Sequence, residues 1–552
     1  MSRRSRDASV DSTTRSRFWL LFGYAALTFL SFPHPIGGVV LDLGRFVSWF
    51  GPALLIAALE GVAPGRAARL AFLGGLAAHT AILHWIYIVT VVYGHAPVIA
   101  GFAGPLGLGI YIAVFPAMFG ATWAALARAG FGSPWVAAAA WTLFDHFRSF
   151  ALSGFPWATL GYAQHANSFL LELAPYTGVY GLSFVTVLAG AAVFAFVRAV
   201  RRGERPGGDV WLAAVAVVAV HVFGAGVADP DPDRDLPRIR VAVLQGNVDQ
   251  GVKWSPDRAE AILSGYEELA RAAADDGAGI IVWPETALSG FLDVDPELRR
   301  RISDLAIATA ATQVIGAVGL ATDPRDRSTL YFDSAYVVAP DGRFVDRYDK
   351  SHLVPFGEYV PARDLLGTVL RAVARGIAPD NVTPGPGPRA LAIPDPRAPG
   401  QQVKSGVPIC YELLFPDLVR RMVADGAEIL FAITNDAWYG RTGAPYQFLA
   451  MTALRSAETR VWTARAANTG VSAIIDSRGR VRSRTRIFER DWLAFDVPLR
   501  GAPRGGSFYA RHGDLFAMAC WAAIAMLAIV GWRRGKESPS EEIERRERTV
   551  RS

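Results

Sequence analysis

Long apolar segments fill this chain of 552 residues as far as Val227, and their distribution constrains the fold more than any other feature. Hydrophobic residues make up 51% of the sequence and charged residues only 19%, a balance that a single soluble domain does not show. Residues 239 to about 500, in contrast, have the composition of an ordinary globular domain. We therefore predict a membrane-embedded helical region joined to a globular region.

The apolar segments predict about eight transmembrane helices, because a helix needs about 20 residues to cross a bilayer. The Arg-rich residues 1–17 precede the first segment, and no small-x-small cleavage site closes it. We therefore expect an uncleaved first helix rather than a signal peptide. The candidate segments are residues 18–32, 46–59, 70–92, 98–127, 134–144, 179–200, 210–227 and 515–532.

The arginines between these segments predict their orientation, since cytoplasmic loops carry the excess of Lys and Arg. With a cytoplasmic N-terminus, eight spans place Arg66, Arg128 and residues 198–205 on the cytoplasmic side. This topology accounts for the net charge of +6. No basic stripe interleaved with aromatic residues is present in the sequence, so we expect no nucleic-acid partner. The predicted divisions are a cytoplasmic tail (1–17), a transmembrane domain of about seven helices (18–227), an extracytoplasmic domain (228–512), a C-terminal transmembrane helix (513–532) and a cytoplasmic tail (533–552).

The globular region alternates short strand signals with a few helix signals, which favours a layered α/β sandwich whose topology the pattern leaves open. Glu285, Lys350 and Cys410 each stand at the end of a strand signal. Strand ends on one edge of a sheet converge on one pocket. There Glu285 would accept the thiol proton, Lys350 would favour the thiolate and stabilise an oxyanion, and Cys410 would carry an acyl group as a thioester.

Each of these residues also has a plain structural explanation. Taken singly, Glu285 would be expected as a helix N-terminal or turn carboxylate, Lys350 as a surface cation and Cys410 as a core thiol. The other cysteine, Cys520, lies within the C-terminal apolar segment, so Cys410 has no obvious disulfide partner and suits an oxidising compartment. No His and Cys cluster has metal-ligand spacing and no Gly-rich phosphate loop opens a helix, so we expect neither a metal nor a cofactor.

Longer motifs surround the three residues and continue into the membrane region. They are Trp283-Pro284-Glu285, Tyr348-Asp349-Lys350, residues 353–359, Cys410-Tyr411-Glu412, residues 245–248 with Lys253-Trp254, residues 434–438, residues 465–470, and residues 154–157 with 160–162. Together they resemble the nitrilase superfamily, specifically the apolipoprotein N-acyltransferase family. The resemblance covers nearly the whole chain apart from its two tails, and the membrane motif distinguishes it from a soluble nitrilase.

The resemblance implies a specific fold, reaction and location. The globular domain is expected to be an αββα sandwich facing the periplasm from the bacterial inner membrane. The reaction is expected to transfer an acyl chain from a membrane phospholipid to the N-terminal amine of a diacylglyceryl apolipoprotein. The resemblance implies Glu285 as general base, Lys350 as oxyanion partner and Cys410 as nucleophile.

Further residues match positions near that site in the family. Glu358 and Glu412 are expected to orient Lys350 or to assist proton transfer, with Tyr411 beside them. Trp254 and Trp438 match positions at the active site or its entrance. For both tryptophans, aromatic packing or anchoring at the membrane face is an equal alternative.

The chain departs from the family pattern at two places. Phe448 stands where the family commonly has His, and Asp145 with Arg148 stands where a Glu and Arg pair is usual. Asp145 and Arg148 are expected either to pair near the membrane boundary or to form a solvated loop pair.

Two other functions compete with acyl transfer. A membrane-tethered amidase or nitrilase would use the same three residues to release the acyl group to water, and an open hydrophilic pocket would favour it. Residues 361–375 and 438–446 are candidate lids that would exclude water instead. A non-catalytic scaffold that binds lipid or lipoprotein would need none of Glu285, Lys350 and Cys410.

Overall fold

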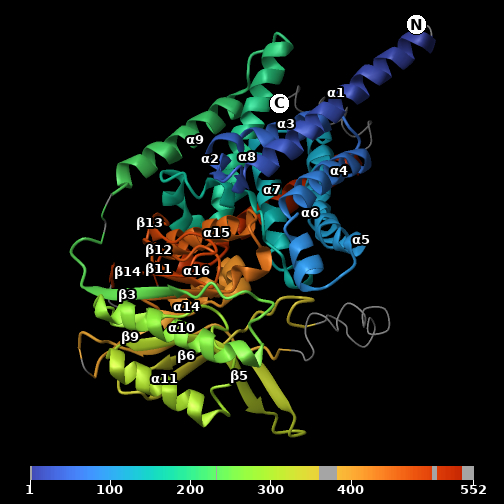
Figure 1. The fold of residues 1–552 in the computed structure, drawn as a ribbon. Coiled ribbons are helices and arrows are strands. Elements are labelled where there is room, and N and C mark those ends of the chain that lie inside the picture. The colour runs from blue at the N-terminus through green and yellow to red at the C-terminus, as the bar shows by residue number, and fades with distance from the viewer. Residues whose placement is uncertain are drawn as a thin grey trace.

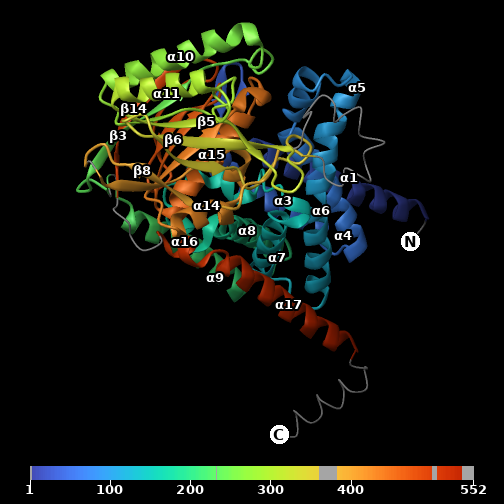
Figure 2. The same cartoon turned by 90° about the horizontal axis from the view of Figure 1, so that it is seen from below.

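Figure 1 shows the computed structural model of the chain, in which a group of long helices lies beside a domain built on two β-sheets. The structure describes residues 3–229, 231, 233–359, 382–398, 400–499 and 506–536. The first part of the chain supplies most of the long helices. The last helix, α17 (Leu515–Lys536), returns to them from the sheet domain and packs against α7, as Figure 2 shows from below.

The helical region follows most of the predicted apolar segments. Among the described residues, the helices long and apolar enough to cross a membrane are Ala103–Arg128, Leu170–Arg201, Gly208–Val227 and Leu515–Arg534. The eight-span topology goes further than this finding and stays a prediction. The helices of this region are α1 (Arg3–Leu30), α2 (Gly44–Val47), α3 (Phe50–Leu59), α4 (Pro64–Ile82), α5 (Val98–Gly101), α6 (Ala103–Arg128), α7 (Pro134–Arg148), α8 (Ala174–Arg201) and α9 (Gly208–Val227).

Helices α9 and α17 turn large apolar side chains outward. Trp211 and Val215 on α9, and Met518 and Met526 on α17, are more than half exposed. A helix with all its backbone hydrogen bonds made internally and an apolar outer face suits a lipid environment.

The segment predicted over 70–92 differs from the observed structure. Helix α4 begins at Pro64, which suits a first helical position, and ends at Ile82. A short π-helix, η1 (Ile88–Tyr93), follows after a turn. The indole of Trp85 in that turn is buried, with its ring centroid 4.7 Å from that of Trp157 and 4.8 Å from that of Tyr439. The chain thus leaves α4 before its apolar pattern ends, at a point where Trp85 packs against both Trp157 of the helical region and Tyr439 of the sheet domain.

The globular region is a sandwich of two six-stranded sheets with helices on both outer faces (Figure 1). One sheet has the order β14-β3-β4-β5-β6-β7 and carries α10 (Pro256–Asp275) and α11 (Pro296–Thr309). The other has the order β13-β12-β11-β10-β9-β8 and carries α14 (Pro416–Ala424) and α15 (Ala444–Thr459). The strands are β3 (Arg238–Gln245), β4 (Ile280–Val282), β5 (Thr312–Thr322), β6 (Thr329–Val338), β7 (Phe344–Asp349), β8 (Ala390–Pro394), β9 (Gln402–Gly406), β10 (Ile429–Thr434), β11 (Trp462–Ala467), β12 (Ala473–Ile475), β13 (Val481–Arg484) and β14 (Asp491–Pro498).

Alternating side chains explain why these strands are apolar throughout. In β3, Val241 and Val243 face the core between the sheets, whereas Ala242 and Leu244 face α10. A sheet covered on both faces needs apolar residues at every position, which the sequence shows. The patterns did not identify α11, β8, β13 or β14. Strand β13 is a sheet edge that exposes Val481 and Arg482, and such a polar edge gives no apolar signal.

Candidate active site

The three chemically active residues of the sequence analysis meet at one edge of the sandwich. Strands β4 and β7 run in the same direction, so Glu285 and Lys350 follow strand ends on the same side. Strand β9 runs parallel to β10 in the facing sheet, and Cys410 follows it. The structure therefore brings Glu285, Lys350 and Cys410 together, as strand-end convergence predicted.

Cys410 lies at a sharp turn between a strand and a short helix. Its backbone has a φ of 46°, a conformation that residues other than glycine rarely adopt, and it begins the 3-10 helix η5 (Cys410–Leu414). Its side chain is buried. Burial and the negative charge of Glu285 raise the pKa of the Cys410 thiol well above its usual value, although Lys350 lowers it. The thiol is therefore neutral at rest, and a base must remove its proton before it can act as a nucleophile.

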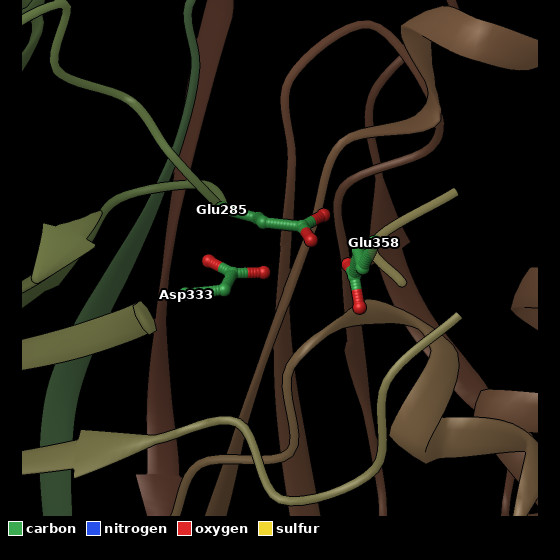
Figure 3. Close-up of side chains that lie close together, drawn as sticks. All are labelled: Glu285, Asp333 and Glu358. Atoms are coloured by element: carbon green, nitrogen blue, oxygen red, sulfur yellow. The ribbon is translucent and has the colours of Figure 1, made fainter. Parts of the chain in front are cut away.

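Lys350 contacts three carboxylates, those of Glu285, Asp333 and Glu358, whose side chains Figure 3 shows lying close together. Its Nζ donates to Glu285 Oε1 at 3.3 Å, to Asp333 Oδ2 at 3.3 Å and to Glu358 Oε1 at 2.5 Å. The side chain is fully buried. Burial lowers the pKa of Lys350, but Glu358, Glu285 and Asp333 outweigh that effect and hold its pKa well above the usual value. Lys350 is thus a permanent cation inside the site.

The same three carboxylates could in principle hold a metal ion. Glu285, Asp333 and Glu358 each offer an oxygen within 4.8 Å of the others. The ammonium of Lys350, however, already lies between them at hydrogen-bond distance. A cation therefore occupies the position that a metal would need, and the donor set does not fit a metal centre.

Glu285 is held in place by the facing sheet. Its Oε2 accepts a hydrogen bond of 2.7 Å from the backbone N–H of Asn435, which follows β10. Burial raises the pKa of Glu285, but the charge of Lys350 and contacts with Asp333 and Cys410 outweigh burial and lower it below its usual value. An ionised Glu285 beside a protonated thiol is the arrangement that a general base requires.

Asp333 belongs to the site although the sequence analysis did not name it. It lies in β6, opposite the end of β7, and its backbone carbonyl accepts a 2.8 Å bond from the Lys350 N–H. Burial and repulsion by Glu285 raise the pKa of Asp333 well above its usual value. The one available signal was an Asp within an otherwise apolar strand pattern, which is costly unless it has a partner.

Glu412 joins the Lys350 segment to the Cys410 turn. One carboxylate oxygen accepts from Tyr348 Oη at 2.8 Å and from the Ser351 N–H at 2.7 Å, and the other accepts from the Ile409 N–H at 2.9 Å. The carboxylate is fully buried. Glu412 therefore joins the segment after β7 to the segment after β9 through hydrogen bonds, and its carboxylate has no contact with the Lys350 ammonium among those described.

The remaining predicted residues lie around this centre. Tyr411 is buried and its hydroxyl donates to Gly154 O at 2.9 Å, in the membrane-region motif. Trp438 is half-buried and lies edge-to-face with Tyr93 of η1, with ring centroids 5.5 Å apart. Trp254 is 46% exposed.

Lys253, next to Trp254, is a second buried cation at the site. Its Nζ lies 3.5 Å from the backbone oxygen of Glu285. Burial lowers the pKa of Lys253 to about 8, against the charges of Glu285 and Asp333. The sequence analysis placed this residue only within a motif.

The structure describes only one of the two candidate lids. Residues 361–375 lie outside the described residues. Residues 438–446 include the end of η6 (Asp436–Tyr439) and the start of α15. Tyr439 in this segment contacts both Trp85 and Trp157 of the helical region. This segment is therefore part of the contact between the two regions.

The two departures from the family pattern are both buried. The ring of Phe448 is fully buried, and the guanidinium carbon of Arg465 lies 4.9 Å from its centroid, so an aromatic ring takes part in a cation–π contact there. Arg148 Nη2 and Asp145 Oδ1 lie 3.5 Å apart, and both side chains are at least nine-tenths buried. The solvated loop pair is therefore wrong, because both side chains are buried at the C-terminal end of α7.

Comparison with known proteins finds a family match for each of the two regions. Residues 240–501 match the carbon-nitrogen hydrolase family, and residues 19–192 match the apolipoprotein N-acyltransferase N-terminal domain. An apolipoprotein N-acyltransferase of Geobacter metallireducens is 36% identical over 542 residues, covering 96% of this chain and 98% of the relative. One of Methylococcus capsulatus is 33% identical, covering 91% of this chain and 96% of the relative.

Solved structures of the nitrilase superfamily are also similar. Nit3 of Saccharomyces cerevisiae has a TM-score of 0.36 and 18% identity, covering 48% of this chain and 90% of that chain. An amidase from Nesterenkonia has a TM-score of 0.35 and 18% identity, covering 51% of this chain and 96% of that chain.

The globular region thus has a carbon-nitrogen hydrolase fold, with a buried thiol, carboxylate and ammonium at one edge. The helical region has its own match within the same chain. The chain belongs to the apolipoprotein N-acyltransferase family.

Proposed function

We propose that this protein N-acylates the N-terminal diacylglyceryl-cysteine of apolipoproteins, with a membrane phospholipid as acyl donor and Cys410 as the acyl carrier. The observation that carries the proposal is the buried thiol of Cys410 beside an ionised Glu285 and a permanently charged Lys350. The apolar helices beside this site support a reaction between two substrates that are both held in a bilayer.

The first half-reaction loads the enzyme. Glu285 accepts the Sγ proton while Sγ attacks the ester carbonyl of the phospholipid. Lys350 Nζ stabilises the oxyanion of the tetrahedral intermediate. The ester C–O bond then breaks, the lysophospholipid oxygen takes the proton from Glu285, and a thioester remains on Cys410.

The second half-reaction delivers the acyl chain. The neutral N-terminal amine of the apolipoprotein attacks the thioester carbonyl, and Glu285 accepts an amine proton. The C–S bond breaks, the thiolate takes the proton from Glu285, and an amide forms. The enzyme returns to its starting state without a cofactor.

The other residues have supporting roles in this proposal. Glu358, at 2.5 Å from Lys350 Nζ, orients the ammonium toward the oxyanion. Glu412 fixes the turn that presents Cys410, and Tyr411 lies beside the nucleophile. Trp254 and Trp438 flank the route by which the acyl chains enter.

The proposed topology follows the sequence prediction. Residues 18–227 and 513–532 span the inner membrane with about eight helices, and residues 228–512 face the periplasm. The tails 1–17 and 533–552 are cytoplasmic. The outward apolar faces of α9 and α17 support this arrangement.

Intact-mass measurement of the purified protein tests the function. Wild type and Cys410→Ala are incubated with a phospholipid of defined acyl chains, and a diacylated lipopeptide is then added. We expect wild type alone to gain one acyl mass and to lose it to the lipopeptide amine.

Two results would contradict the proposal in different ways. Loss of the acyl mass to water, with the lipopeptide unchanged, would establish a tethered hydrolase instead. If Cys410→Ala were acylated as fast as wild type, Cys410 would not be the acyl carrier.

A further inference from the structure

A buried arginine in the helical region contacts the loop that reaches the active site. Arg148 is the last residue of α7, and its Nη2 donates to Thr159 Oγ1 at 2.9 Å. Thr159 Oγ1 donates in turn to Pro156 O at 2.9 Å. The backbone oxygen of Arg148 accepts from the Phe155 N–H at 3.2 Å. Arg148 therefore holds the loop of residues 149–159 both through its side chain and through its backbone.

Asp145 contacts the same guanidinium nitrogen that donates to Thr159. Its Oδ1 lies 3.5 Å from Arg148 Nη2, and its Oδ2 accepts from Ser183 Oγ of α8 at 2.8 Å and from Trp141 Nε1 at 3.2 Å. An uncompensated charge at this depth would be strongly unfavourable, so each residue of the pair requires the other.

The loop itself has an unusual backbone. Leu152, Ser153 and Ala158 have φ values of 51°, 72° and 58°, and Gly154 has a φ of 83°. Residues other than glycine hold such conformations only where surrounding contacts impose them. At Gly154 even a methyl group is excluded, because a Cβ would lie 2.1 Å from Ser149 O.

The strained loop touches the residue next to the proposed nucleophile. Tyr411 Oη donates to Gly154 O at 2.9 Å, and both residues are buried. Trp157 makes a second contact with the sheet domain, because its Nε1 donates to Gln447 Oε1 at 2.8 Å. Hydrogen bonds and the backbone of residues 154–156 thus link Asp145 in the helical region to Tyr411, which follows Cys410 directly.

We propose that Arg148 is a positioning residue for the acyl-transfer site. Its guanidinium holds the 149–159 loop in its strained conformation, and Gly154 on that loop fixes Tyr411 and with it the turn that presents Cys410. This inference rests on the proposed function, because it takes Cys410 as the nucleophile.

A cavity beside the pair leaves room for a conservative substitution of Asp145. It measures about 30 Å³, and both Asp145 and Arg148 line it. A space that can hold water can also hold the extra methylene of a glutamate. Arg148 Nε has no hydrogen-bond partner among the described residues, so a longer carboxylate has a donor to reach. Asp145→Glu therefore keeps the charge pair, whereas Asp145→Ala removes it.

The test is the rate at which Cys410 gains one acyl mass from a phospholipid in a single turnover. We expect Arg148→Gln and Tyr411→Phe each to slow this rate about tenfold or more, since small displacements of a nucleophile cost large factors in rate. The double variant should be no slower than the slower single variant, because both changes break the same chain of contacts. Asp145→Glu should acylate at the wild-type rate, whereas Asp145→Ala should be slowed like Arg148→Gln.

Arg202→Gln is the matched control. Arg202 forms an exposed 2.7 Å pair with Glu60 at the far end of α8, so its loss removes a charge without touching the loop. If Arg148→Gln does not purify as folded protein, Arg148→Lys replaces it, because an ammonium keeps the charge but ends one bond short of Nη2, the atom that contacts both Asp145 and Thr159.

The outcomes separate this inference from the proposed function. An Arg148 variant as fast as wild type, or rate losses that multiply in the double variant, would overturn the positioning role. Wild type that never gains an acyl mass at Cys410 would instead overturn the proposed function.

Discussion

At the scale of single residues, burial and charge divide protons unequally among neighbouring carboxyl groups. Asp333 and Glu285 share one small volume, and burial with repulsion raises the pKa of Asp333 while Lys350 helps to lower the pKa of Glu285. The pKa values of the two carboxyl groups thereby shift in opposite directions. A bound proton is therefore favoured on Asp333 over Glu285.

Lys253 should shift the pH dependence of enzyme acylation. Its charge lowers the pKa of Glu285, so in Lys253→Met that pKa rises and the base is protonated over a wider acid range. We expect the acid limb of the acylation rate to move to higher pH, with the rate near pH 8 changed by no more than about twofold. The pH profile of single-turnover acylation measures this, with the exposed Lys404→Met as control. An unchanged acid limb would contradict it.

At the scale of elements, the position of Glu285 depends on how closely β5 passes beneath it. A Cβ at Gly316 would lie 2.1 Å from Pro284 O and 2.7 Å from Glu285 Cα. The strand can therefore approach the turn only where it has no side chain. The convergence of strand ends brings Glu285, Lys350 and Cys410 near one another, and this close approach limits where the Glu285 turn can lie.

Gly316→Ala should displace the Glu285 turn. We expect a loss of stability of about 1–3 kcal/mol from overpacking and a fall in acylation rate of up to about 100-fold. Thermal unfolding and single-turnover acylation measure the two effects. Gly208→Ala, where a Cβ would meet nothing within 4 Å, is the control. A Gly316→Ala enzyme with wild-type rate would show that the turn has room to move.

At the scale of the whole molecule, a buried charged pair joins the two regions. Glu458 on α15 accepts from Arg455 at 3.0 Å and from the Val179 N–H of α8 at 2.8 Å. That N–H follows a kink at Gly178, where φ is 63°. Burial raises the pKa of Glu458 to about 7, although Arg455 and the Val179 N–H lower it. The docking of the sheet domain on α8 therefore depends on a titrating group.

Stability should fall with rising pH through this group. A carboxyl whose pKa is raised on folding contributes stability that is complete below its unfolded value of 4.5 and is lost as the pH rises through about 7. Glu458→Gln imitates the protonated form, so its unfolding temperature relative to wild type should increase between pH 5 and pH 8. Glu458→Ala should be less stable at every pH, because the Val179 N–H loses its acceptor. A constant difference between Glu458→Gln and wild type would contradict the linkage.

The proposed topology can be tested by labelling in intact cells. Both native cysteines are buried, so wild type should react little with a maleimide that does not cross membranes. Arg300→Cys, on the exposed face of α11, should label in cells with a permeable outer membrane, whereas Arg202→Cys should label only after lysis. Labelling of Arg202→Cys in intact cells would reverse the orientation.

Sequence patterns alone determined much of the secondary structure of this protein, because those patterns depend on residues close together in the chain. Apolar run length and strand alternation depend on neighbours in the chain, so the helical region, most strands, and the strand-end placement of Glu285, Lys350 and Cys410 were all readable. The edge strand β13 and the early end of α4 were not, because exposure at a sheet edge and packing of Trp85 depend on distant elements.

The tertiary structure alone decided the partners within the site. Asp333, 17 positions before Lys350, and Asn435, 150 positions after Glu285, reach the centre only because two sheets face each other. The contact of Tyr411 with Gly154 joins residues 257 positions apart. No local pattern encodes such distances, since they arise when burial of both sheet faces and of α8 brings separate elements together. The sequence thus determined which groups were available for chemistry, and the tertiary structure decided which of them hold one another in place.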